Sequence, residues 1–186
     1  YFFSFYFFNC SIEIERKEIL KDVIEGYDVT IGRDNIIYII HQGIDNHLYL
    51  SSILDDKVNV ICITKSPITI AYNLKLLIVG DETHIFYQLL IDKTNKVYRI
   101  FHITYQNSCW NVEKIQDIKV QDVLNPISVF NQGEKIYIIF YDLVETEELF
   151  IMNYDNIKHT WAEKIRLTND SSMKLYLDTL LDGDYI

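Results

Sequence analysis

The stretches that decide the fold are Ile37-Tyr38-Ile39-Ile40, Thr83-His84-Ile85-Phe86, Ile136-Tyr137-Ile138-Ile139 and Asp184-Tyr185-Ile186. Their second residues stand at positions 38, 84, 137 and 185, so one apolar pattern returns after 46, 53 and 48 residues. A period near 50 residues with several strands in each unit is typical of a β-propeller or a related array of β repeats. The sequence therefore predicts an all-β, β-propeller-like array of four-stranded antiparallel blades.

A second signature marks the fourth strand of each repeat. Trp110-Asn111-Val112-Glu113-Lys114-Ile115 matches Trp161-Ala162-Glu163-Lys164-Ile165, and Ile12-Glu13-Ile14-Glu15-Arg16-Lys17 is a weaker copy. Charges that alternate with Ile or Val are typical of an outer edge strand with one solvated side. We therefore expect these strands on the outside of each blade and the Ile/Tyr strands inside. The competing fold is a β-sandwich, which explains the number of strands but not the phased repeat of both signatures.

The whole chain, residues 1–186, is predicted to be one propeller-like domain. Turns such as Gly80-Asp81-Glu82 and Gln132-Gly133-Glu134 separate first from second strands, because Gly, Asn and Asp tolerate the positive φ of tight hairpins. The chain starts with Tyr1 rather than Met and stops inside an expected strand, so we expect a partial propeller from a longer protein. The predicted blades cover 27–64, 68–118 and 126–168, with a partial blade at 1–20 and the start of a further blade at 173–186.

Strand bounds follow from the apolar runs between these turns. In the blade at 68–118 we expect strands at Ile68–Val79, Thr83–Ile91, Val97–Tyr105 and Trp110–Ile118. In the blade at 126–168 we expect them at Pro126–Asn131, Lys135–Leu143, Glu148–Tyr154 and Thr160–Leu167.

Composition and charge exclude several classes of protein. Hydrophobic residues make up 49% of the chain, yet Ala occurs only at Ala71 and Ala162, which favours strands over helices. The net charge of −10 repels phosphate backbones, so nucleic acid is not expected as a partner. Apolar runs such as the one in Tyr1–Phe8 are shorter than the roughly 18 residues of a membrane span, so we expect no membrane insertion within this segment.

The cysteines favour neither a disulfide framework nor a structural zinc site. Cys10, Cys62 and Cys109 are odd in number, widely spaced and free of any C-x-x-C pair. Each lies in or beside an apolar stretch, so we expect small core residues. Free cysteines of this kind are compatible with the cytoplasm, but the localisation stays open.

Thr83-His84-Ile85-Phe86-Tyr87-Gln88-Leu89-Leu90 carries a resemblance to a known group of proteins. With Lys135–Tyr141 and Asn156–Trp161, it resembles uncharacterised bacterial proteins, common among clostridia, that are built from degenerate β-propeller repeats. Their units carry an apolar-His-Ile/Val-Phe/Val-Tyr motif, then a turn, a Tyr-rich strand and a Trp-containing strand. The resemblance covers nearly the whole chain and implies a fold, with no established activity. The unit near Asp28 lacks the Trp, whose place falls near Lys57–Val60, and fits least well.

Propeller glycoside hydrolases of the sialidase type are the alternative. They carry Ser-x-Asp-x-Gly-x-x-Trp turns and an arginine triad for a carboxylate. This chain has no such turn, and its four arginines are Arg16, Arg33, Arg99 and Arg166. The likeness to that class stops at the fold, which does not establish a function.

His84 and His102 are the best candidates for metal ligands. If Ile91 pairs with Val97 across the Asp92–Lys96 turn, His84 faces Thr104, and His102 becomes a diagonal neighbour of His84 on the same face of the sheet. Two histidines without a third ligand make a weak metal site, so we favour a packed, hydrogen-bonded core pair. His41 and His47 flank one turn, where we expect surface positions.

Acidic clusters and aromatic residues are the remaining candidates. None of the clusters has the spacing of an EF-hand loop, so we read them as turn chemistry; they are Asp55-Asp56, Asp182-Gly183-Asp184 and Glu145-Thr146-Glu147-Glu148. Trp110 and Trp161 could stack on sugars, but repeated aromatic positions more often hold adjacent blades together. The chain has no P-loop, G-x-S-x-G or G-x-G-x-x-G motif.

These observations favour a non-catalytic binding or scaffold module for a protein or a glycan, with a carbohydrate-active enzyme as the alternative. We expect no catalytic residue, no cofactor and no bound metal. By analogy with propellers, the partner surface is formed by the second-to-third loops and the crossovers between blades. Within that surface the partner-binding residues we single out are Glu145, Glu147 and Glu148. The loops and crossovers are Gly43–Asn46, Asp92–Lys96, Asp142–Glu148, Lys65-Ser66-Pro67, Lys119–Asn125 and Asn169–Ser172.

Overall fold

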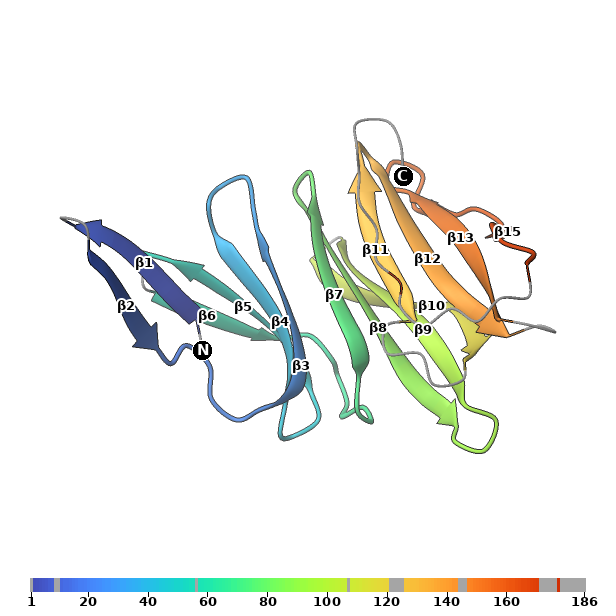
Figure 1. Ribbon diagram of the computed structural model, residues 1–186, viewed down its shortest axis with the longest axis horizontal. Helices are drawn as coiled ribbons and strands as arrows, with labels where there is room; N and C mark the ends of the chain where they lie inside the picture. Colours follow the sequence, from blue (N-terminus) through green and yellow to red (C-terminus); the bar gives the residue numbers. More distant parts are fainter. Residues whose placement is uncertain are drawn as a thin grey trace.

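The computed structural model describes residues 2–8, 11–55, 57–106, 108–120, 126–143, 147–170 and 177, and every regular element within this part is a β-strand (Figure 1). It follows that no helix in the described part could cross a membrane. The strands are β1 (Phe2–Phe8), β2 (Ser11–Lys17), β3 (Val23–Ile31), β4 (Ile37–Gly43), β5 (Leu48–Leu54), β6 (Lys57–Cys62), β7 (Tyr72–Val79), β8 (Glu82–Asp92), β9 (Val97–Gln106), β10 (Cys109–Lys119), β11 (Ile127–Gln132), β12 (Lys135–Leu143), β13 (Glu147–Asp155), β14 (Thr160–Trp161) and β15 (Ile165–Arg166).

Strands β3 to β15 form three antiparallel sheets that follow the chain order. Blade I has the order β3-β4-β5-β6 and blade II the order β7-β8-β9-β10. Blade III has the order β11-β12-β13, and both β14 and β15 pair with β13. Strands β1 and β2 form a separate two-stranded sheet. This arrangement is the all-β array of antiparallel blades that the repeat predicted.

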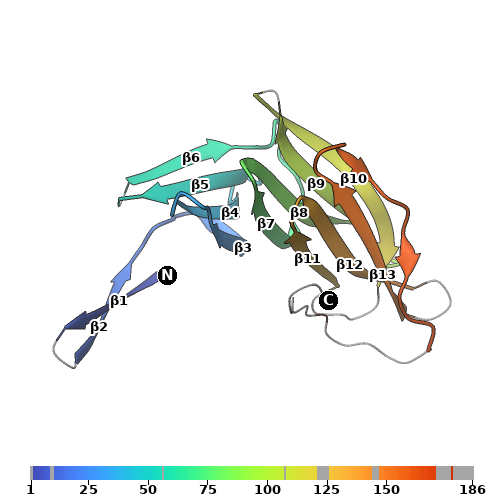
Figure 2. The same cartoon turned by 90° about the horizontal axis from the view of Figure 1, so that it is seen from above.

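The blades stand side by side like those of a propeller. Seen from above in Figure 2, they fan out from the first strands β3, β7 and β11, and the fourth strands lie on the periphery. Strand β7 lies beside both β3 and β11, so the first strand is the innermost strand of each blade. The outer position expected for the fourth strands is confirmed, since every residue of β6 and most of β10 are exposed.

Most strand bounds were predicted within a residue or two, and β12 matches the expected Lys135–Leu143. Strand β7 begins at Tyr72 rather than Ile68, because the Gln42 side chain holds the preceding connector. Gln42 Nε2 donates to Thr69 O at 3.0 Å, and Ala71 N donates to Gln42 Oε1 at 2.9 Å. The fourth strand expected at Thr160–Leu167 is divided into β14 and β15.

Two apolar clusters join the blades. Successive side chains of a strand point to opposite faces, so each sheet can contribute to two interfaces. In β8, Ile85 packs with Leu76 and Ile103 against blade I, while the next residue, Phe86, packs against blade III. We call the side that meets the preceding blade the leading face and the opposite side the trailing face.

Three of the four residues that defined the repeat occupy equivalent places, and the fourth, Tyr185, lies outside the described residues. Tyr38, His84 and Tyr137 lie on the second strands, at the same step inside the first hairpin of each blade. Their partners on the first strands are Thr30, Leu77 and Phe130.

A seven-residue hairpin motif, Gly-x-Asp-Asn-x-x-Tyr, occurs at both ends of β4, as Gly32–Tyr38 and as Gly43–Tyr49. In the second copy the Asp45 carboxylate accepts hydrogen bonds from His47 N at 3.2 Å and from the Tyr49 hydroxyl at 2.6 Å. Asn46 completes the turn with φ 67°. A Cβ atom at Gly43 would lie 2.7 Å from Asp45 Oδ1 and 2.8 Å from Tyr49 Cε2, so this close approach requires glycine.

We expect Gly43→Ala to destabilise the protein by about 1–3 kcal/mol, because the added methyl group overpacks the turn against Asp45 and Tyr49. Urea unfolding followed by circular dichroism measures the loss. Asn46→Gly in the same turn is the control, and its free energy of unfolding should change by less than about 0.5 kcal/mol, because glycine adopts positive φ without strain. Equal stability of Gly43→Ala and wild type would contradict the packing described for this turn.

Candidate functional site

The hairpins between second and third strands and the connectors between blades meet at one end of the molecule, which we call the crossover end (Figure 1). Backbone hydrogen bonds tie them together there. Ile44 N donates to Asp22 O and Ile68 N to Asn46 O, both at 2.9 Å, and Val120 N donates to Lys96 O at 3.3 Å. The placement expected for these loops is therefore observed in blades I and II. Residues 121–125, 144–146 and 171–172, which belong to three of the predicted loops, lie outside the described residues.

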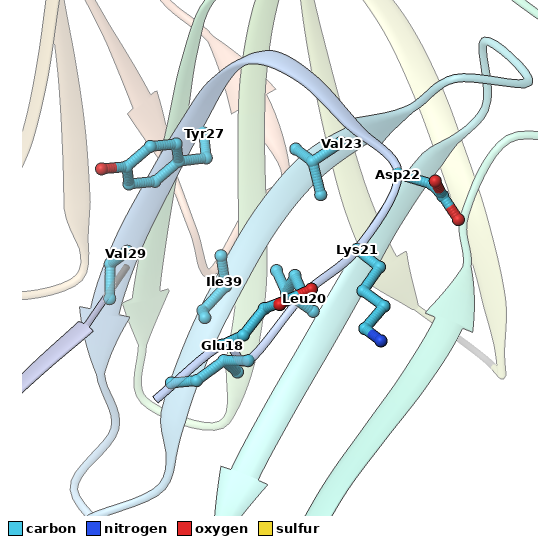
Figure 3. Close-up of a pocket in the computed structure, with 9 residues that line it drawn as sticks. Glu18, Leu20, Lys21, Asp22, Val23, Tyr27, Val29 and Ile39 are labelled. Carbon is cyan, nitrogen blue, oxygen red and sulfur yellow. The ribbon is translucent and has the colours of Figure 1, made fainter. Parts of the chain in front are cut away.

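A hollow of about 740 Å³ opens between the connector 18–22 and the leading face of blade I (Figure 3). Val29 and Ile39 contribute apolar side chains from β3 and β4, whereas Glu18, Lys21 and Asp22 bring charges on the connector. The complete lining is Glu18, Ile19, Leu20, Lys21, Asp22, Val23, Tyr27, Val29 and Ile39. With one basic residue in its lining, this hollow suits an apolar group better than a phosphate.

A second hollow, of about 420 Å³, shares Ile19–Asp22 with the first and reaches the β4–β5 hairpin. Its wall includes His41 and Tyr49, whose rings stack with centroids 5.6 Å apart. The hydrogen bond from Tyr49 lowers the pKa of the Asp45 carboxyl, and Asp45 in turn raises the pKa of Tyr49 to about 12. Tyr49 therefore stays protonated near neutral pH and acts as a hydrogen-bond donor that fixes the hairpin.

The histidine pair predicted on blade II is present. His84 pairs with Thr104, and His102 with Phe86, as the expected register requires. His84 Nδ1 lies 3.0 Å from His102 Nε2, and the two rings stack with centroids 5.2 Å apart. The register assumed at the turn is wrong in one detail, because Val97 pairs with Asp92 and the ladder shifts between Leu90 and Asp92.

The pair is buried between blades II and III among aromatic rings. His84 is fully buried and His102 is 1% exposed. The ring of Phe86 stacks on His102 at 4.4 Å, and Tyr154 and Trp161 of blade III meet His102 edge to face at 4.8 and 5.4 Å. Trp161 therefore holds adjacent blades together, which is the role that its repeated position predicted.

Burial decides the charge state of both rings. Desolvation lowers the pKa of His84 from 6.5 to about 4, and it lowers the pKa of His102 well below its ordinary value. Two neutral imidazoles can share one N–H···N hydrogen bond, with one ring as donor and the other as acceptor. The described residues contain no group of three or more His, Cys, Asp or Glu side chains that could hold a metal ion. The pair is thus a packed core feature.

Several other expectations at histidines and cysteines are wrong. His41 is 5% exposed rather than a surface residue, because it stacks under Tyr49. His47 is half-buried, with its Nδ1 3.0 Å from Thr64 O. Cys62 and Cys109 are exposed rather than core residues, since both lie on outer strands. Cys10 lies outside the described residues.

The acidic clusters divide between turns and buried ion pairs. Asp55 is exposed in a turn with φ 47°, while Asp56 and the cluster at 182–184 lie outside the described residues. Glu145 also lies outside them, and Glu147 begins β13. Glu148 is fully buried: Arg166 contacts its Oε1 at 3.1 Å, and the Thr168 hydroxyl donates to its Oε2 at 2.5 Å. Its carboxylate therefore fixes the segment around β15.

Two features near the crossover end were missed by sequence reasoning. The hollows are lined by a connector that carries no motif, so nothing in the sequence predicted them. The hydrogen bond between Asp45 and Tyr49 could have been found, because the Gly-x-Asp-Asn-x-x-Tyr motif occurs twice in the sequence, with the two copies eleven residues apart.

No family model and no curated protein matches the chain. Among solved structures, the fold resembles a β-propeller glycoside hydrolase, the GH93 alpha-L-arabinofuranosidase of Fusarium graminearum in complex with arabinobiose, with a TM-score of 0.57. The two share 11% sequence identity over 81% of this chain and 50% of that chain. The chain thus spans about half the length of the protein it matches, and at this identity the likeness shows the fold alone. The propeller part of the resemblance found in the sequence is supported, while its bacterial, clostridial part stays an interpretation of the residue pattern.

We expect the stability of the protein to fall as the pH drops from 6.5 toward 4. The pKa of His84 is about 4 in the folded state and near 6.5 in the unfolded state. The unfolded state therefore binds this proton more tightly, and protonation of His84 favours unfolding. At 1.36 kcal/mol per pKa unit, His84 alone accounts for up to about 3 kcal/mol. Urea unfolding at pH 7 and pH 4.5 measures the difference.

The control for this prediction uses the equivalent residues of blade I, Tyr38 and Leu50. The double variant His84→Tyr/His102→Leu should lose most of the pH-dependent decrease, while His47→Gln should keep it. A decrease of the same size in the double variant would show that other groups cause it.

Proposed function

We propose that the protein is a non-catalytic recognition module that binds a glycan or a protein at the crossover end of its blades. The observation that carries the proposal is an aromatic pair formed by exposed Tyr72 and half-buried Tyr98, whose rings meet edge to face at 5.6 Å. Tyr72 begins β7 and Tyr98 follows the β8–β9 hairpin, so both lie at the crossover end. Tyr72 is 38% exposed, and its accessible ring suits the apolar face of a sugar.

The β8–β9 hairpin, which precedes Tyr98, carries polar side chains that can form hydrogen bonds. Asp92 accepts hydrogen bonds from Thr94 N at 2.9 Å and Asn95 N at 3.0 Å, which fixes the backbone of the turn. The exposed Asn95 amide, held at 2.7 Å by Asp92 Oδ2, is presented at the tip. Small-molecule sites combine aromatic side chains with a small number of well-placed polar groups, and Asn amides are among these groups.

A non-catalytic role is favoured because buried and half-buried carboxylates of the described residues already serve the fold. Asp28 Oδ2 accepts a hydrogen bond from Leu76 N at 2.8 Å and joins blades I and II. Asp142 accepts one from Lys119 N at 3.1 Å and forms an ion pair with Lys164 at 3.1 Å. Glycoside hydrolysis needs two carboxyl groups about 5–9.5 Å apart on either side of the scissile bond. Carboxylates committed to backbone and lysine partners are poor candidates for that role.

The acidic loop between β12 and β13 belongs to the same proposal. Glu145 and Glu147 remain the acidic partner-binding residues, whereas buried Glu148 serves as their structural anchor. Charge reversal of Glu145 and Glu147 should therefore weaken the binding of a protein partner with little loss of stability, but reversal of Glu148 should unfold the segment around β15.

We expect Tyr72→Ala to weaken oligosaccharide binding at least tenfold and to change the melting temperature by less than about 3 °C. Isothermal titration calorimetry with a panel of oligosaccharides, beginning with arabinobiose, measures the binding. Tyr105→Ala is the matched control, because Tyr105 is 46% exposed but lies at the opposite end of β9. Binding that is lost equally in both variants, or found only with a protein ligand, would refute the glycan site at Tyr72.

A carbohydrate-active enzyme is the second candidate, and the fold match to an arabinofuranosidase favours it. The carboxylates that could serve are Glu18 and Asp22, which line the same hollow. We expect no release of arabinose from arabino-oligosaccharides in a chromatographic assay. Hydrolysis that is abolished by Glu18→Gln or Asp22→Asn would establish the enzyme instead.

A further inference from the structure

The leading face of blade I has the composition of an interface between blades. Its central row runs Val29, Ile39, Ser51 and Val60 across the four strands. The same row in blade II contains Leu76, Ile85 and Ile103, which are 2%, 0% and 0% exposed under blade I. In blade III it contains Val129, Ile138 and Met152, which belong to the cluster shared with blade II.

Blade I differs from the other two in what covers this face. The connector 18–22 lies over it and leaves the two hollows of about 740 and 420 Å³. In the next row, Ile31 is 66% and Val58 is 43% exposed. The equivalent row of blade III contains Ile136 and Tyr154, which are 0% and 2% exposed beneath blade II. In the central row Ile39 and Ser51 are 1% and 0% exposed, but Val60 is 50% exposed. Apolar side chains that are exposed together on one face mark an interaction surface.

The sheet of β1 and β2 has the form of the piece that would cover this face. Its hairpin pairs Phe8 with Ser11 across two residues. The third-to-fourth hairpins of blades I and II pair Leu54 with Lys57 and Gln106 with Cys109, also across two residues. With the hairpins aligned, Glu15 of β2 coincides with Glu113 of β10, so the repeated charge pattern and the hairpin register agree. Strands β1 and β2 are therefore equivalent to a third and a fourth strand.

We propose that the leading face of blade I is the seat of a further blade whose third and fourth strands are β1 and β2, and that the two hollows are unfilled parts of that interface. The connector from Lys17 to Val23 is short and is fixed by the hydrogen bond from Ile44 N to Asp22 O at 2.9 Å. A short connector places consecutive elements next to each other, so the occupant belongs to the same chain and not to a second copy.

The alignment gives one specific contact. His102 of blade II lies 4.8 Å from Tyr154 and 5.4 Å from Trp161 on the leading face of blade III, measured between ring centroids. The position equivalent to His102 in the new blade is Ser4, and Tyr154 and Trp161 correspond to Ile53 and Val58 of blade I. The seated blade thus places position 4 opposite positions 53 and 58.

Cysteine cross-linking in the whole protein tests this contact. In a background with Cys10, Cys62 and Cys109 replaced by serine, Ser4→Cys is combined with Val58→Cys and treated with a thiol reagent that spans about 10 Å, the separation of packed sheets. The matched control combines Ser4→Cys with Ile61→Cys, because Ile61 is 45% exposed on the opposite face of the same strand. We expect the 4–58 pair to cross-link within one chain at least tenfold faster than the 4–61 pair.

Three results of the cross-linking experiment would overturn the proposal. Equal rates for the two pairs, or no cross-link at all, overturn it. A 4–58 cross-link between two chains, seen as a dimer after denaturing electrophoresis, assigns the face to a second copy and also overturns it. If Val58→Cys disturbs folding, Ile53→Cys takes its place, with neighbouring Ser52→Cys on the opposite face as its control.

Discussion

The constraint on which the structure depends is that each sheet must be covered on both faces. Strand β8 shows it most directly, because its neighbouring residues Ile85 and Phe86 are both fully buried and point into different interfaces. A sheet covered on both sides needs consecutive apolar residues, whereas a sheet with one solvated side needs alternation. A stretch of the Ile-Tyr-Ile-Ile type therefore indicates a strand that lies inside a stack of blades. Polar ties such as that between Asp28 and Leu76 N then fix how the blades are set against each other.

The histidine pair shows that the packing between blades can accommodate buried polar rings. At the places that Tyr38 and Leu50 occupy in blade I, blade II buries two imidazoles between aromatic rings. Burial of a polar group is costly unless it finds a hydrogen-bond partner, and here each ring supplies one for the other. Glu82 lies 3.7 Å from the remaining His84 nitrogen, too far for a direct hydrogen bond. The same burial that makes the pair compatible with the interface keeps both rings neutral and unsuited to proton transfer near pH 7.

The sequence predicted the blade arrangement and most strand bounds, because period, turn residues and apolar runs are all local signals. It also predicted that His84 faces Thr104, since hairpin register follows from the turn. It failed where the environment is made by distant segments. The burial of His41 depends on Tyr49 and on the connector 18–22, and the exposure of Cys62 depends on its outer strand, although the surrounding residues are apolar. The sequence pattern places Glu148 in an acidic surface loop, but Arg166 and Thr168, about twenty residues later, contact its carboxylate.

Strands and loops have different roles in this fold, which is why we propose that binding occurs at the loops. On the faces of the blades, side chains are committed to neighbouring sheets, so a hollow on such a face is first of all a place where a sheet is expected. At the crossover end the turns are held by their own carboxylates, Asp45 in one hairpin and Asp92 in another, and not by the core. Because these turns are stabilised locally, the residues at their tips can change without disturbing the stack. Under the proposed function, ligand contacts come from the tips and from aromatic residues beside them, such as Tyr72, rather than from the two hollows on blade I.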